Sequence, residues 1–311
     1  MRILITGGTG TFGQMAAQQF LNRGDTVTVY SRDEMKQEAM EREFDNPRLR
    51  CFLGDVRDLE RLTLACRSQD VLIHAAALKI VPRCEFDPFE AVKTNVGGTE
   101  NAIKAVLATD VSKCVFINTD KAVDPINLYG ATKKVAEHMW LAANNYARDG
   151  LPAFSAVRYG NVWGSRGSVV PFWNKCVEEG KPLPVTDPEM TRFFMLPDEA
   201  VELVNYAIDN MKGTEVFIPR LKAYSVRGLL GAFKLLYPGY TSSNIGIRSG
   251  EKLHERMASE YELPSIAGYD PFILSSNNLV KIPCTEWGAL ASNSTYQMSV
   301  HDIVKHLGDL K

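Results

Sequence analysis

The 311-residue sequence predicts an α/β fold built on a doubly wound, mainly parallel sheet, and three observations support this class. Short, almost continuously apolar runs alternate with longer helical patterns through the first half of the chain. Such runs are typical of strands buried on both faces, and the alternation is typical of strands joined by crossover helices. Glycines cluster directly after the first run, and charged residues follow the fifth, at the strand ends where such sheets build their sites.

Each element is expected from its own pattern. Helical periodicity covers residues 12–23, 88–108 and 129–149, between the apolar runs. From about residue 165 the alternation stops, prolines cluster, and a helical segment at 197–212 precedes another apolar run. The strands expected in the first half are residues 2–6, 26–30, 49–55, 70–76, 113–119 and 153–160.

The composition is that of an ordinary soluble globular protein, with 45% hydrophobic and 23% charged residues. A formal net charge of -2 without basic blocks gives no reason to expect nucleic acid or an anionic membrane as a partner. No apolar run approaches the roughly 20 residues that cross a bilayer, and the segment before the first glycines is too short for a signal peptide. Six cysteines without a C-x-x-C pair indicate reduced thiols, so we expect a cytoplasmic protein with no metal site.

The sequence ITGGTGTFG places Gly7, Gly10 and Gly13 between the first expected strand and the first expected helix. Glycines permit a tight turn and let a pyrophosphate approach the amide groups at the helix N-terminus. A plain strand-to-helix turn would not need three glycines in this register, so we expect a dinucleotide cofactor here. Its contacts are expected from Gly7, Gly10, Thr11, Phe12 and Gly13.

The residues that end the second strand indicate which nicotinamide dinucleotide is bound. A carboxylate there binds the ribose 2′-hydroxyl of NAD, whereas a cation accommodates the 2′-phosphate of NADP. Ser31, Arg32 and Lys36 favour NADP, while Asp33 keeps NAD as the less favoured alternative. Further cofactor contacts are expected from Asp55 and Val56 after the third strand, and from Ala75, Ala76 and Lys79 after the fourth.

Two pairs of reactive side chains follow the fifth strand. Tyr129 and Lys133 are four residues apart and therefore share one helical face. There the lysine can hold the cofactor ribose and lower the pKa of the tyrosine phenol. Asp120 and Lys121 lie side by side just before them, and their plain alternative is a solvated loop. With the glycine cluster, the Y-x-x-x-K pair resembles the short-chain dehydrogenase/reductase superfamily in its extended branch.

We therefore expect a Rossmann-like α/β protein in two parts. Residues 1–164 should form the NADP-binding domain that carries the catalytic residues. Residues 165–311 should form a smaller, mixed α/β lobe that mainly binds the substrate and sends some segments back to the first domain.

Longer motifs narrow the resemblance to the UDP-N-acetylglucosamine 4,6-dehydratases of bacterial surface-sugar pathways. They include HAAALKIVPRCEFDPFEAVKTNVGGTEN, TDKAVDPINLYGATK, RYGNVWGSRGSVVPFW and GIRSGEKLHE, and the resemblance runs from residue 2 to about 256. The most similar type is the soluble, inverting one that opens pseudaminic acid biosynthesis. This resemblance implies oxidation at C4, elimination of water across C5 and C6, and return of the hydride to C6. The product would be a C5-inverted UDP-4-keto-6-deoxy-N-acetylhexosamine.

The resemblance and the chemistry together assign roles to the reactive residues. Tyr129 would deprotonate the C4 hydroxyl, with Lys133 supporting it and the ribose. Asp120 would protonate the departing C6 oxygen, and Thr119 would hydrogen-bond the C4 oxygen. Lys121 would abstract the C5 proton as a neutral amine, so we expect burial and neighbouring positive charges to lower its pKa.

A UDP-sugar carries a diphosphate, so cations should face it. The substrate contacts expected by resemblance come from Lys79, Asn161, Arg166, Arg192, Arg248 and Glu251. Each of these residues has a plain alternative as a surface charge or an interlobe ion pair. His74 and His254 are expected to pack rather than to bind metal, because no partner stands at ligand spacing.

Two other functions fit the same scaffold. A nucleotide-sugar epimerase or reductase would need the tyrosine and lysine but not the adjacent acid and base. A non-catalytic NADP-binding regulator would be expected to lack Tyr129, Lys133 or Asp120, and all three are present. Self-association is common in this superfamily, so we also expect a homo-oligomer.

Overall fold

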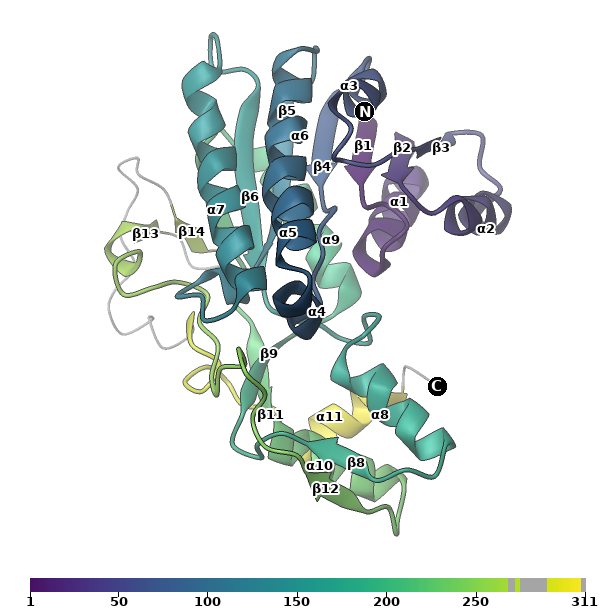
Figure 1. Ribbon diagram of the computed structural model, residues 1–311, viewed down its shortest axis with the longest axis vertical. Coiled ribbons are helices and arrows are strands. Elements are labelled where there is room, and N and C mark those ends of the chain that lie inside the picture. The colour runs from purple at the N-terminus through teal and green to yellow at the C-terminus, as the bar shows by residue number, and fades with distance from the viewer. Residues whose placement is uncertain (268–271, 275–289, 309–311) are drawn as a thin grey trace.

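The computed structural model describes residues 1–267, 272–274 and 290–308, and Figure 1 shows them arranged as two lobes. The larger lobe contains a long sheet with helices on both faces, and the smaller lobe hangs below the carboxyl ends of its strands. Five cysteines in these residues carry free thiols, and Cys284 lies outside the described residues. None of the helices in the described residues is long and apolar enough to span a membrane.

A nine-stranded sheet organises the larger lobe within the described residues, in the order β13-β14-β10-β6-β5-β4-β1-β2-β3. The seven strands from β3 to β10 pair in parallel, and β14 and β13 continue one edge antiparallel. The expected Rossmann-like parallel sheet is therefore confirmed. The strands are β1 (Arg2–Thr6), β2 (Thr26–Ser31), β3 (Leu49–Leu53), β4 (Val71–His74), β5 (Lys113–Thr119), β6 (Ala153–Tyr159), β10 (Val216–Ile218), β13 (Ile266–Ala267) and β14 (Phe272–Leu274).

Helices cover both faces of this sheet (Figure 1). On one face α1 (Thr11–Arg23) packs beside α9 (Pro197–Asn210). On the other face α6 (Gly98–Leu107) packs between α3 (Leu59–Cys66) and α7 (Leu128–Ala142). Each helix turns its buried side chains toward the sheet, which is why the strands are apolar on both faces. The doubly wound arrangement brings the carboxyl ends of the strands to one edge.

The helix expected at residues 88–108 contains a π-helical turn. It begins as α5 (Pro88–Val92), passes through the π-helical residues Lys93–Gly97, and continues as α6. Asn95 in this turn is buried and holds both backbone groups of Leu78, accepting from its N–H at 2.7 Å and donating to its C=O at 3.0 Å. The extra residue therefore fixes the loop that follows β4, a role in which π-turns are frequent.

Other elements of the larger lobe differ from expectation mainly at their ends. The helix expected at 129–149 ends as α7 at Ala142 and continues as a 3-10 helix over Ala143–Tyr146. Three further helices, which the sequence patterns did not single out, are α2 (Glu34–Phe44) after β2, α3 after β3 and α4 (Val81–Phe86) after β4.

The smaller lobe has its own apolar core around Trp163, Trp173 and Phe233. A three-stranded sheet in the order β11-β9-β7 connects it to the larger lobe, and a two-stranded sheet pairs β12 with β8. Although α9 and β10 follow residue 165, they pack with the large sheet. The elements are β7 (Asn161–Val162), α8 (Val169–Glu178), β8 (Leu183–Val185), β9 (Thr191–Met195), β11 (Lys222–Ser225), α10 (Val226–Leu236), β12 (Ser242–Asn244) and α11 (Val300–Gly308).

A buried ion network ties the large sheet to a segment that returns late in the chain. Arg158 on β6 is fully buried, and its guanidinium lies 2.6 Å from Glu137 on α7 and 3.0 Å from Glu262. The same guanidinium donates to the Met257 carbonyl at 2.7 Å. Asn118 at the end of β5 also donates to Glu137. Residues 257–262 are thereby fixed against the strand ends.

Replacing Arg158 by methionine should leave Glu137 buried without its charge partner. Because an uncompensated buried charge is costly, we expect the free energy of unfolding to fall by about 3 kcal/mol in urea denaturation. The matched control is Arg256→Met, since Arg256 pairs with Glu260 at the surface and surface pairs contribute little. Equal stability of the two variants would show that the network does not hold this segment.

Candidate active site

A cleft of about 1470 Å³ lies between the two lobes, at the carboxyl ends of the parallel strands. It extends from the glycine turn after β1 to β9, β11 and the segment around residue 250. The structure brings nearly all the residues predicted for the cofactor, the catalytic group and the substrate to this one cleft. The exceptions are Asp55 and Asp120, which do not line it.

The glycine turn forms a cradle with room for a phosphate group. A Cβ atom on Gly13 would overlap the backbone of Gly8, so only glycine lets the helix start this close to the strand. Gly10 is the N-cap of α1 and has no side chain that could occupy the first amide groups. Those amides and the helix dipole favour an anion. The residues present therefore fit the pyrophosphate of a dinucleotide.

The far end of the cofactor site is rich in cations whose carboxylate partners are already engaged. Asp33 caps α2 by accepting from the backbone N–H of Lys36, and it also pairs with the Lys36 ammonium. Arg32 lies 3.6 Å from Asp55, but Asp55 accepts two hydrogen bonds from the Arg57 guanidinium, at 2.9 and 2.6 Å. Arg32 itself lines the cleft, with about half of its side chain exposed.

The two pairs predicted to be catalytic meet where β5 ends. Asp120 and Lys121 lie in a 3-10 turn (Asp120–Ala122), and α7 packs directly on this turn. A Cβ atom on Gly130 would overlap the Lys121 carbonyl oxygen, so the glycine after Tyr129 permits this close packing. The Oδ1 atom of Asp120 accepts hydrogen bonds from the Thr119 hydroxyl and the Lys121 ammonium, both at 3.0 Å.

The protonation of Lys121 differs from expectation. Burial lowers the pKa of this lysine, but the negative charges of Asp120 and Glu255 outweigh burial and raise the pKa above its ordinary value. The expected lowering is therefore wrong, because Glu255, whose carboxylate lies 3.3 Å from the ammonium, was not anticipated. The resting lysine is a cation held between two carboxylates.

Tyr129 and Lys133, the other predicted pair, also have shifted pKa values. Burial lowers the pKa of Lys133 to about 7, with Glu137 opposing, and its ammonium donates to the Ile117 carbonyl at 2.6 Å. Burial raises the pKa of Tyr129 to about 12, while the charge of Lys121 acts in the opposite direction. Lys121 is therefore the nearby cation that favours ionisation of the tyrosine.

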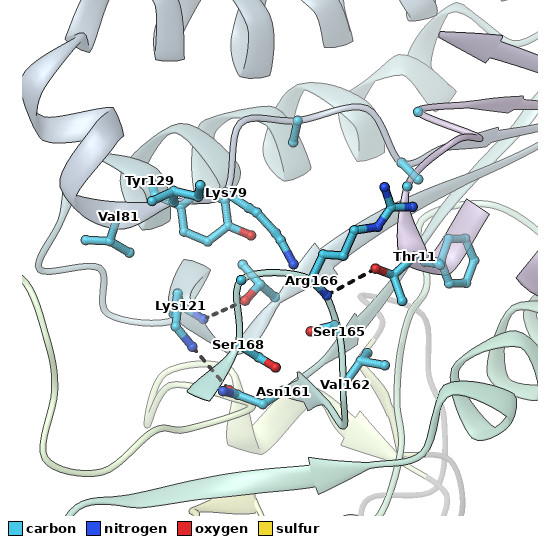
Figure 2. Close-up of a pocket in the computed structure, with 18 of the residues that line it drawn as sticks. Thr11, Lys79, Val81, Lys121, Tyr129, Asn161, Val162, Ser165, Arg166 and Ser168 are labelled. Carbon is cyan, nitrogen blue, oxygen red and sulfur yellow. Dashed lines mark hydrogen bonds between the residues drawn. The ribbon is translucent and has the colours of Figure 1, made fainter. Parts of the chain in front are cut away.

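The substrate end of the cleft carries the predicted polar groups. The Arg192 guanidinium donates to the carbonyls of Thr191 and Leu253, at 2.8 and 3.2 Å, which fixes it on the cleft wall. Arg248 and Glu251 lie 3.9 Å apart on the opposite segment. Asn161 lies between the two ends, and its side-chain oxygen accepts from Lys121 at 3.5 Å (Figure 2).

Arg166 lies at the glycine turn rather than beside Arg192 and Arg248. Its backbone N–H donates to the Thr11 hydroxyl at 3.2 Å, and its guanidinium donates to the Thr9 carbonyl at 2.8 Å and to the side chain of Gln14. Figure 2 shows Arg166 next to Thr11. The Lys79 side chain points toward Arg166, and in this view Lys79 lies between Arg166 and Lys121. The loop from the smaller lobe thus closes over the cofactor cradle.

Sequence reasoning missed Glu255, and it expected both histidines to pack. Glu255 is the last residue of the motif GIRSGEKLHE, so the motif contained it, but nothing local marks it as a partner of Lys121. His74 is fully buried, and its ring contacts the hydroxyls of Thr6 and Thr99. His254 contacts the hydroxyl of Thr191 at 2.8 Å.

Two curated relatives show what the chain is similar to. It is 47% identical over 260 residues to a UDP-N-acetylglucosamine 4,6-dehydratase (inverting) from Campylobacter jejuni, covering 83% of this chain and 77% of the relative. It is 39% identical over 267 residues to a UDP-glucose 4-epimerase from Rickettsia massiliae, covering 84% of this chain and 78% of the relative.

Solved structures confirm the architecture. The protein named Pen from Bacillus thuringiensis superposes with a TM-score of 0.92 and 34% identity, covering 100% of this chain and 98% of that one. A dTDP-glucose 4,6-dehydratase from Streptomyces venezuelae, solved with NAD bound, gives a TM-score of 0.74 at 22% identity and shares the fold, covering 81% of this chain and 87% of that one.

The model of one family matches residues 3–274, which span the whole parallel sheet and most of the cleft. The relatives confirm the resemblance noted in the sequence motifs. The chain belongs to the polysaccharide biosynthesis protein family.

Proposed function

We propose that the protein is an NADP-dependent UDP-N-acetylglucosamine 4,6-dehydratase that inverts C5 and supplies a keto-deoxy sugar for surface glycans. The observation that carries this proposal is the contact of Asp120 and Lys121 at 3.0 Å beside Tyr129, where the cofactor and substrate ends of the cleft meet. The 47% identity to an inverting dehydratase supports it. An acid and a base next to an oxidising tyrosine are what elimination requires.

The overall reaction removes one molecule of water and leaves the redox state of the enzyme unchanged. The C4 hydroxyl becomes a ketone, and the C5 proton and the C6 hydroxyl leave as water. The hydride taken from C4 makes C6 a methyl group, and a proton added to the opposite face of C5 gives the inverted product. A nicotinamide held in the cleft would supply the reversible hydride transfer. The ketone at C4 acidifies the C5 proton, so the elimination follows the oxidation.

Tyr129 is the proposed base for the C4 hydroxyl. Burial holds its pKa at about 12, so it needs nearby positive charge to ionise. Lys121 supplies that charge in the resting site, and Lys133 stands one helical turn further along the same face of α7. The cation next to the phenol would therefore assist the oxidation before it takes part in the elimination.

Asp120 and Lys121 are the proposed acid and base of the elimination. The resting ion pair and the reactive pair differ only in the position of one proton, which moves from the Lys121 ammonium to Asp120 Oδ1 across 3.0 Å. Asp120 is fully buried, whereas the hydroxyl of Thr119 contacts it at 3.0 Å and lines the cleft. We assign to Thr119 the relay of the Asp120 proton to the departing C6 oxygen.

NADP is favoured over NAD by the charges at the end of β2. Asp33 is engaged as a helix cap and ion-pair partner, so its carboxylate is not free for a ribose 2′-hydroxyl. Arg32 and Lys36 line the cleft there and could accept the 2′-phosphate. At the other end, UDP would be held by Arg192 and Arg248, with Glu251 near the uridine ribose.

A nucleotide-sugar 4-epimerase is the second candidate, favoured by the 39% identity to a UDP-glucose 4-epimerase. Epimerisation needs the oxidation at C4 by Tyr129 but leaves the C5 proton and the C6 hydroxyl in place. The buried acid next to Lys121 would then have no chemical role, which is why we place this candidate second.

Proton NMR of the protein with UDP-N-acetylglucosamine in D2O tests the proposal. We expect a 4-keto-6-deoxy product with deuterium at C5 and ring couplings that show inversion there. The variant Asp120→Asn should keep cofactor binding and lose product formation by about a hundredfold or more, because the elimination loses its acid. Formation of the C4 epimer without loss of water would contradict the proposal and favour the second candidate.

Replacing Arg32 by serine should change the choice of cofactor. We expect the affinity for NADPH, followed by its fluorescence, to fall about tenfold through loss of one charged phosphate contact. The affinity for NADH should stay within about twofold, because NADH has no 2′-phosphate. Arg42→Ser on α2, the helix that follows Arg32, is the control, since Arg42 is exposed and pairs with Glu38. Parallel losses for both cofactors would contradict this assignment.

Replacing Arg166 by alanine should weaken the cofactor more than UDP. The loss of its contacts to Thr9 and Gln14 opens the loop over the pyrophosphate, so we expect about a tenfold loss in NADPH affinity. UDP affinity, measured by calorimetry, should change by less than about twofold. Arg227→Ala is the control, because Arg227 forms an exposed pair with Glu189. A larger loss for UDP would restore the substrate role first expected for Arg166.

A further inference from the structure

Glu255 is a buried carboxylate that none of the roles above uses. It is 2% exposed, and its side chain lines the cleft next to Lys121. Its backbone is held on both sides by Ser292, which accepts from the Glu255 N–H at 2.8 Å and donates its own N–H to the Glu255 carbonyl at 2.9 Å. The side chain therefore points into the cleft from a fixed backbone.

The two oxygens of Glu255 have different surroundings. Oε1 lies 3.3 Å from the Lys121 ammonium. Oε2 is buried without a hydrogen-bond partner, and the nearby Lys252 ammonium is 3.8 Å away and donates to the Val123 carbonyl. Burying a carboxylate with so few hydrogen-bond donors lowers the stability of the fold, so its presence needs a functional explanation.

We propose that Glu255 is a positioning residue for Lys121, holding its amine toward the cleft and setting the pH above which it can accept a proton. This inference rests on the proposed function. When the Lys121 ammonium gives one proton to Asp120, the remaining amine can still donate an N–H to Glu255 Oε1. The nitrogen lone pair then lies on the side of Asp120 and the cleft, so the contact with Glu255 limits the amine to orientations from which it can reach the C5 proton.

The charges around Lys121 determine the direction of the effect. Asp120 and Glu255 raise its pKa, and Arg192 lowers it. Removing the charge of Glu255 therefore makes the neutral amine easier to form, so the acidic limb of the rate profile should move to lower pH. The other titratable groups that interact with Lys121 are Lys252, on the segment of Glu255 itself, and Lys79, Tyr129 and Tyr224, on three further segments.

The test compares Glu255→Gln with the wild type and with Glu260→Gln, which changes an exposed glutamate five residues later on the same segment. Product formation from UDP-N-acetylglucosamine is followed as a function of pH. We expect the acidic limb of E255Q to shift down by about one pH unit, a usual effect of a charge at this distance. KM should change by less than about threefold, because the residue acts on the amine rather than on substrate binding. E260Q should match the wild type.

A second measurement does not depend on turnover. The Lys121 signal in carbon-13-labelled lysine spectra, identified by its loss in Lys121→Arg, should titrate at lower pH in E255Q. If E255Q does not fold, Glu255→Asp carries the test, because the longer separation should give a smaller shift in the same direction. An unchanged Lys121 titration overturns the inference even if the wild type is active. An inactive wild type with a shifted titration instead overturns the proposed function and leaves the coupling intact.

Discussion

The arrangement of the site depends on one buried cation, Arg158. Its guanidinium satisfies Glu137 on α7, Glu262 and the Met257 carbonyl at the same time. Those partners come from a helix that carries half of the catalytic group and from the segment that delivers Glu255. Since an unpaired charge in this interior would be very costly, the three parts hold one relative position. The proposed catalytic residues all lie at the end of β5 and on α7 in the larger lobe, and the late segment brings Glu255 to them.

The positively charged side chains of the cleft differ in exposure and in ion pairing between the cofactor end and the centre. At the cofactor end they are exposed and paired loosely, as Arg32 is with Asp55 at 3.6 Å. At the centre they are buried and controlled, because Lys121 is stabilised as a cation by two carboxylates, while burial brings the pKa of Lys133 to about 7. The pKa values of two lysines one element apart are therefore shifted in opposite directions from the ordinary lysine value. Sequence spacing cannot encode this difference, since it comes from what lies around each amine.

Local signals made the larger lobe predictable. The glycine cluster, the apolar strands and the Tyr129–Lys133 spacing each depend on residues within a few positions of each other, so the sheet and the cofactor end could be derived from the chain. Lys121 and Glu255 are 134 positions apart, and only folding brings them within 3.3 Å. For Arg166 and Asp33, the sequence did not reveal the interaction partners. Both were recognised as charged groups in the right motifs, but their partners, the glycine turn and the α2 amides, become visible only in three dimensions.

The π-helical turn at Lys93–Gly97 makes the shape of the cleft sensitive to the number of residues in this helix. The extra residue of the π-helical turn lets Asn95 leave the regular helical position. Its side chain forms hydrogen bonds with Leu78 and with the hydroxyl of Thr132. Deleting one residue there would restore regular helix and turn α5 by about 100° relative to α6. Asn95 would then leave the loop after β4, whose Lys79 faces the cofactor cradle. Chain length in this helix is therefore coupled to the shape of the cleft, which the helix lines with Thr94 and also shapes through that loop.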